Sequence, residues 1–183
     1  VVITFLDPDV QVNPYLILAG IGIGATVGSL IALKVKMTSI PEMVALFNGF
    51  GGLATFFIAW SEFNSVPDNT FQYVLIMLTT YIGGVTFSGS IVAYGKLSEK
   101  LKIQKTSIIT KFFTTIFYVS IIYLIYSILI ANIFIPPFDF FIVLLALTLL
   151  GGIGFVIPIG GGDMPVVISL LNSFSGIAAA FAG

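Results

Sequence analysis

The sequence predicts an all-α, polytopic transmembrane helix bundle with about six spans. Of the 183 residues, 58% are hydrophobic and only 8% are charged, whereas soluble domains carry about 25% charged residues. The mean hydropathy is correspondingly high, at +1.14. The apolar residues fall into six runs, each close to the roughly 20 residues that a helix needs to cross a bilayer. We therefore interpret residues 1–183 as a single transmembrane domain, cut from a longer polypeptide.

Short polar, glycine-rich or proline-containing breaks separate these runs. Ser39-Ile40-Pro41-Glu42 has the spacing of a capping box and predicts the start of the second helix. Further boundaries are predicted at Pro67-Asp68-Asn69, at Pro136-Pro137 and at the three glycines 160–162. The predicted spans are 13–33, 40–60, 70–95, 107–131, 138–159 and 164–183.

The first span contains Gly20, Gly24 and Gly28 at intervals of four residues. This small-xxx-small spacing predicts close contact with another membrane helix. The run Gly20–Gly24 superficially resembles a dinucleotide fingerprint, but that motif requires a strand before it and lies here inside a continuous apolar span. We therefore predict no nucleotide site in this chain.

The composition also excludes other kinds of site. The chain has no cysteine and no histidine, so no thiolate metal site or disulfide framework is expected and we predict no metal site. The formal net charge of −1 gives no indication of nucleic-acid binding. The aromatic residues, with Tyr15, Trp60 and Tyr73 near predicted boundaries, are expected mostly at the lipid or at the membrane interface.

The charged residues predict one orientation. With six spans, the lysines fall on one side, and the positive-inside rule places that side in the cytoplasm or the mitochondrial matrix. Five acidic residues fall on the opposite side. The lysines are Lys34, Lys36, Lys96, Lys100, Lys102, Lys105 and Lys111, and the acidic residues are Asp7, Asp9, Glu62, Asp68 and Asp139.

The last span is the most informative. Asp163 occupies the N-cap position and Pro165 lies in the first turn, which predicts a helix start. Asn172 lies nine residues further on, roughly 14 Å below the start and near the middle of a hydrocarbon core about 30 Å thick. Polar groups at that depth usually mark an ion or proton path.

The polar residues of the last span share one helical face. Ser169, Asn172, Ser173 and Gly176 follow the spacing of such a face, which favours a path over packing alone. Histidine is the side chain best suited to carry protons near neutral pH. Because the chain has none, a proton path here requires water, carboxylates or a titratable group from another chain.

The second span carries Asn48 on one face with Gly49 and Gly52. Asn48 lies roughly 9 Å below Glu42 by helix rise. Two interpretations are open, an interhelical amide hydrogen bond and a water-binding group in a proton path. Ser90, taken alone, is interpreted as structural, because hydroxyls in membrane helices often bond to their own backbone.

Three stretches together resemble the beta subunit of the proton-translocating NAD(P) transhydrogenase. They are KMTSIPEMVALFNGFGGLA at 36–54, TFSGSIVAYGKL at 86–97 and GGDMPVVISLLNSFSG at 161–176. The resemblance implies that earlier helices, a last helix and a soluble NADP(H)-binding domain lie outside this chain. It also implies hydride transfer between NAD(H) and NADP(H) on soluble domains, coupled to proton passage through this one.

The resemblance implies a role for each polar residue. Asn172 matches the family's mid-membrane asparagine, and Ser90 matches a serine of the same channel. Asp163, after Gly161 and Gly162, matches the aspartate that faces the NADP(H) domain. Asn48 stands where many relatives have a channel histidine. In relatives that have asparagine at this place, a histidine on a membrane helix of the alpha subunit is thought to serve instead. Ser169 and Ser173 complete the expected path.

The same resemblance sets the expected context. No catalytic or cofactor-binding residue is expected in this chain, and NAD and NADP would bind to other domains. The expected partners are the lipid bilayer, the alpha subunit or subunits and the NADP(H)-binding domain, within a dimeric complex. The expected location is the bacterial cytoplasmic membrane or the mitochondrial inner membrane. The alternative is a polytopic transporter or an oligomeric membrane scaffold whose polar residues serve packing.

Overall fold

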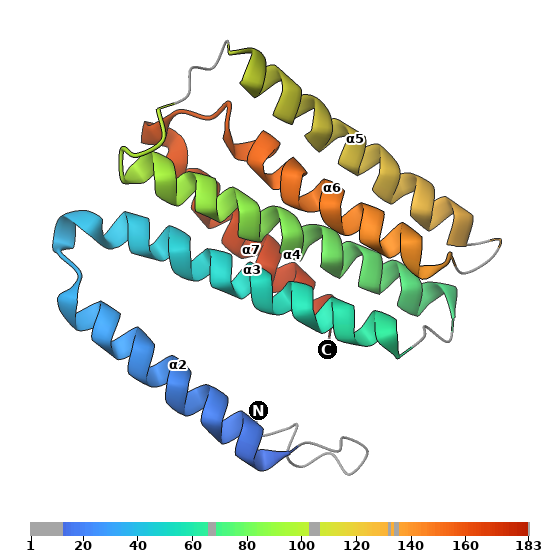
Figure 1. The fold of residues 1–183 in the computed structure, drawn as a ribbon, viewed down its shortest axis with the longest axis horizontal. Coiled ribbons are helices and arrows are strands. Elements are labelled where there is room, and N and C mark those ends of the chain that lie inside the picture. Colours follow the sequence, from blue (N-terminus) through green and yellow to red (C-terminus); the bar gives the residue numbers. More distant parts are fainter. Residues whose placement is uncertain (1–12, 66–68, 103–106, 132, 134–135, 183) are drawn as a thin grey trace. The chain divides into compact units, whose positions relative to one another are not determined.

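The computed structural model describes residues 13–65, 69–102, 107–131, 133 and 136–182, and these residues form helices and no strand. The helices fall into two compact units, residues 1–38 and 39–183. Six helices are long and apolar enough to span a membrane, as predicted. The elements are α2 (Pro14–Lys34), η1 (Met37–Ser39), α3 (Ile40–Asn64), α4 (Thr70–Leu97), α5 (Ile108–Ala131), α6 (Phe138–Val156), η2 (Gly161–Asp163) and α7 (Met164–Ala182) (Figure 1).

The helix bounds agree with the predicted spans to within four residues. The end of the fifth predicted span is one of the larger differences. Helix α6 ends at Val156 rather than at 159, because Pro158 has no backbone N–H with which to continue the helix.

The first unit contains α2. Its N-cap is Asn13, whose side chain accepts a hydrogen bond from the Tyr15 N–H at 3.0 Å, and Pro14 occupies the first helical position. No residue of α2 is buried. The helix contact predicted from Gly20, Gly24 and Gly28 therefore has no counterpart within this unit and stays a prediction.

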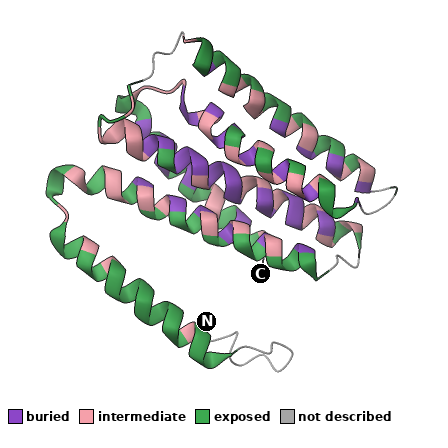
Figure 2. Ribbon diagram, viewed as in Figure 1, coloured by how far each residue is buried: buried purple, intermediate pink, exposed green. Residues whose placement is uncertain are grey.

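The second unit is built around α4. Helices α3, α5, α6 and α7 all pack against it, and Figure 2 shows α4 as the most continuously buried helix. Fourteen of its residues are buried, whereas a surface helix buries only one face. Thr79, Thr80, Thr86, Ser88 and Ser90 of α4 therefore lie inside the bundle.

Glycines bring α3 and α4 into backbone contact. A Cβ atom at Gly52 would lie 2.8 Å from the Phe87 amide nitrogen and 3.0 Å from the Gly83 carbonyl oxygen. A Cβ atom at Gly83 would lie 2.9 Å from the amide nitrogen of Phe56. Such contacts leave room only for glycine, and membrane helices use them to pack closely without a hydrophobic driving force.

Helix α6 approaches α4 from another side in the same way. A Cβ atom at Gly84 would lie 2.9 Å from the Thr148 Cβ, and one at Gly152 would overlap Ser88 and Val85. Small residues therefore line both faces of α4.

The helices of this unit alternate in direction, so their ends form two groups. The Lys96 ammonium of α4 contacts the end of α6, and the Thr70 hydroxyl at the start of α4 donates to the Ala131 carbonyl at the end of α5 at 3.0 Å. We call the two groups the lysine end, with Lys96, Lys100, Lys102 and Lys111, and the opposite end, with Glu62 and Asp139. This alternation agrees with the predicted charge separation for the described residues of this unit. Asp7, Asp9, Asp68 and Lys105 lie outside the described residues, and the sidedness of Lys34 and Lys36, which belong to the first unit, stays a prediction.

Two local expectations were wrong. The capping box does not form, because Ser39 belongs to the 3-10 turn η1, with φ −99° and ψ 3°, and its side chain makes no capping hydrogen bond. Tyr73 does not face lipid: it is fully buried. Its ring packs edge-on against Phe63, which stacks on Phe141 at 4.5 Å, so aromatic contacts hold α3, α4 and α6 together at the opposite end.

The close contact of α3 and α4 predicts a stability difference between two glycines. Gly83→Ala should lower the free energy of unfolding by about 1–3 kcal/mol, because the atoms that its Cβ meets belong to the backbone and cannot rotate away. Gly176→Ala is the matched control: a Cβ there meets nothing within 4 Å, so stability should be unchanged or higher. Thermal unfolding in detergent measures both, and equal stabilities would contradict the contact.

Candidate functional site

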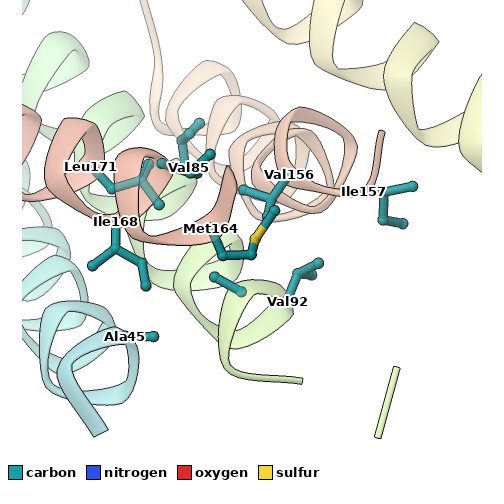
Figure 3. Packing of buried hydrophobic residues seen from close by; sticks show 10 residues of the cluster. Ala45, Val85, Val92, Val156, Ile157, Met164, Ile168 and Leu171 are labelled. Atoms are coloured by element: carbon teal, nitrogen blue, oxygen red, sulfur yellow. The ribbon is translucent and has the colours of Figure 1, made fainter. Parts of the chain in front are cut away.

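The orientation of α7 is fixed by its apolar face. Met164, Val167, Ile168 and Leu171 are buried in a cluster with residues of α3, α4 and α6, including Ala45, Val85, Val92 and Val156 (Figure 3). Burial of apolar surface within the bundle leaves the other side of the helix uncovered. Ser169 and Asn172 lie on that side and are exposed.

A groove of about 480 Å³ lies between α3 and α7. Asn172 and Ser169 line it from α7, and Asn48 lines it from α3. Three of the residues predicted for the path therefore meet at one opening. The full lining is Val44, Phe47, Asn48, Gly51, Pro165, Ile168, Ser169, Asn172 and Ser175.

Asn48 also joins α3 to α4. Its Nδ2 donates a hydrogen bond to the Ser90 Oγ at 2.9 Å, and Ser90 is fully buried. The neighbouring Gly49 permits this contact, because a Cβ at that position would lie 3.2 Å from the Ser90 Cβ. The interhelical hydrogen bond foreseen for Asn48 is present, and the same side chain lines the groove.

Ser90 differs from two neighbouring hydroxyls of its helix. Thr80 and Ser88 donate to the carbonyls four residues earlier, at 2.7 and 3.0 Å, which is the usual behaviour in membrane helices. Ser90 instead accepts a bond from another helix. The interpretation of Ser90 as a purely local structural residue was therefore incomplete.

Ser173 is not part of the groove lining. Its hydroxyl donates to the Ser169 carbonyl at 3.0 Å, so its proton is used within α7. Ser175 does line the groove and was missed by the sequence analysis. Its position three residues after Asn172, on the same helical face, could have indicated it.

Asp163, Gly161 and Gly162 lie at the lysine end. They form η2, directly before α7, and all three are exposed. A Cβ atom at either glycine would meet nothing within 4 Å. The segment is therefore open to a partner, and its predicted contact with a nucleotide-binding domain stays a prediction.

Lys96 holds the segment that precedes η2. Its ammonium donates to the carbonyl oxygens of Val156 at 3.1 Å, of Ile159 at 2.6 Å and also of Ile157. The last carbonyls of a helix have no partner within it and carry partial negative charge. Lys96 thus caps α6 from α4, a role that the sequence analysis did not assign to it.

The groove can bind water but cannot change its own charge. The polar groups of its lining are amides and hydroxyls, and no titratable side chain of the described residues lines it. Among the described residues, no group of three or more His, Cys, Asp or Glu side chains could hold a metal ion. A proton that crosses here must therefore move on water or on a titratable group supplied from outside the groove.

Comparison with known proteins gives one family. Residues 1–183 match the family described as NAD(P) transhydrogenase beta subunit. The chain is 34% identical to the NAD(P) transhydrogenase subunit beta of Rhodospirillum rubrum, and equally to that of its strain ATCC 11170, over 98% of its own length. It spans 40% of the length of these curated relatives.

Loss of the Lys96 cap should destabilise the lysine end. Lys96→Met leaves the carbonyls at the end of α6 without their charged donor, which should lower the free energy of unfolding by about 1.5–3 kcal/mol. Lys102→Met removes the same charge from an exposed position and should have little effect. Thermal unfolding in detergent tests the pair; equal shifts would mean that charge alone, and not the cap, matters.

Proposed function

Because the chain belongs to the NAD(P) transhydrogenase beta subunit family, we propose that it is the proton-conducting part of a transhydrogenase membrane domain. In this proposal, soluble domains outside the chain transfer hydride between NAD(H) and NADP(H), and the chain couples that reaction to proton translocation. The chain itself binds neither nucleotide.

The groove between α3 and α7 carries the proposal. It places Asn48, Ser169 and Asn172 around one opening, with Asn172 roughly 12 Å along α7 from Met164 by helix rise. Polar groups at this depth are costly and are retained where they serve a path. Each can donate or accept a hydrogen bond with water, so the groove suits a chain of ordered water molecules.

The missing titratable group points to a partner. We infer that a helix of the alpha subunit covers the groove and supplies a histidine near Asn48. An open polar groove in a membrane helix bundle needs such a cover, because lipid cannot satisfy its hydrogen-bonding groups. The complex would be dimeric and would lie in a bacterial cytoplasmic or mitochondrial inner membrane, with the lysine end inside.

Asp163 is the proposed link to the soluble domains. It lies exposed directly before α7, so a change of proton or water occupancy at Asn172 can reach it along one rigid helix. A carboxylate at a helix N-terminus is favoured by the positive end of the helix dipole. We infer that it contacts the NADP(H)-binding domain and transmits the state of the groove to nucleotide release.

The alternative function is a transporter or scaffold whose polar residues serve packing. Asn48 fits it in part, because its amide bonds to Ser90. Asn172 fits it poorly, since it is exposed to the groove rather than buried against a neighbouring helix. The position of Asn172 therefore favours the proton path.

Substitution of Asn172 tests the proposed function. In the full complex reconstituted into liposomes, Asn172→Ala should reduce proton pumping at least about tenfold, as expected if the barrier rises by about 1.4 kcal/mol. Ser173→Ala is the control, because that hydroxyl bonds within α7, and it should pump normally. Hydride transfer between the isolated soluble domains should be unchanged. Normal pumping by an assembled Asn172→Ala complex would favour the scaffold.

A further inference from the structure

A second pocket lies at the opposite end of α3 and α4. It measures about 60 Å³, and its polar lining consists of Glu62 from α3 with Gln72 and Thr79 from α4. Glu62 is exposed, so the pocket has a charged residue at its mouth. Since a single water needs about 10–15 Å³ measured in this way, the pocket has room for a few water molecules.

Thr79 is the buried end of this pocket. It is only 2% exposed, and among the described residues its Oγ1 has no hydrogen-bond partner. The adjacent Thr80 is equally buried, but its hydroxyl donates to the Ile76 carbonyl at 2.7 Å. A buried hydroxyl without a partner is costly, and Thr79 places this one in the wall of the pocket.

Thr86 is a second buried hydroxyl of the same kind. It is fully buried and its Oγ1 has no hydrogen-bond partner among the described residues. Thr79, Gly83, Thr86 and Ser90 follow one another at intervals of four, three and four residues, which places them on one face of α4. This face therefore carries unpaired hydroxyls from the pocket toward the Asn48–Ser90 pair.

The glycine contact lies between the two ends of this face. Gly83 is one turn from Thr79 and nearly one turn from Thr86, and its carbonyl oxygen would lie 3.0 Å from a Cβ at Gly52. No water fits between backbones that are this close. The pocket and the Asn48–Ser90 pair are thus separated by a dry contact between α3 and α4.

We propose that this pocket is the outer entry site for the proton that reaches Asn48, Ser90 and Asn172. Glu62 attracts protons from the aqueous phase, water in the pocket carries them to Thr79, and the Gly52–Gly83 contact is where the path is closed in this structure. The inference rests on the proposed function, because it assumes that protons pass through the groove. It adds a second site, on the other side of the bundle, for the same ion.

Two adjacent threonines provide a matched test in the full complex. Thr79→Val keeps the shape of the side chain and removes its hydroxyl, and it should slow proton pumping in liposomes about fivefold, the effect of one lost hydrogen bond. Thr79→Ser keeps the hydroxyl and should pump as wild type. Thr80→Val, whose hydroxyl bonds within α4, should pump as wild type. Equal pumping by the Thr79→Val and Thr80→Val variants would overturn the entry site.

Chemical labelling gives an independent readout. Thr79→Cys should react with Ag⁺, a thiol reagent close to water in size, added on the side of Glu62, and prior addition of Ag⁺ should slow pumping. Thr80→Cys should stay unlabelled. An unreactive Thr79→Cys in an assembled complex would also overturn the entry site. If Asn172→Ala blocks pumping while both Thr79 tests fail, only the entry site is wrong; if Asn172→Ala pumps normally, the proposed function is wrong.

Discussion

The backbone contact between α3 and α4 is the constraint on which the candidate site depends. Gly52 and Gly83 let the two helices approach until a methyl group would not fit between them. One turn away, this approach brings the Asn48 amide to 2.9 Å from the Ser90 hydroxyl. A bilayer offers little hydrophobic drive for helix association, so shape and hydrogen bonds determine which residues meet. Wider spacing of the helices would separate the pair.

The hydrogen-bond partners of the hydroxyl groups separate two kinds of residue in this bundle. Many described threonines and serines, such as Thr80, Ser88 and Ser173, donate to a nearby carbonyl of their own helix. A hydroxyl bonded in this way has a hydrogen-bond partner and needs none on a neighbouring helix. Thr79 and Thr86 do not follow this rule, and a buried polar group without a partner is costly.

The sequence predicted the helices well because hydropathy and span length are set by the bilayer. It also singled out Asn48, Ser169 and Asn172, which line one groove, since polar residues are conspicuous in apolar spans; their role in a proton path stays a prediction. It could not predict that Ser173 lies outside the groove, because adjacent residues on one broad face diverge by about 100° around the helix. The Lys96 cap and the unpaired Thr79 depend on which helices are neighbours, and hydropathy carries no information on this.

The most direct test of the account is a double-mutant cycle on Asn48 and Ser90, read out as the ratio of proton pumping to hydride transfer in the reconstituted complex. If the two side chains act as one hydrogen-bonded unit held by the α3–α4 contact, Asn48→Ala and Ser90→Ala should each lower the ratio. The double variant should then lower it no further than the more damaging single change, because coupled residues are not additive. Additive losses, or a ratio that neither change affects, would contradict the account.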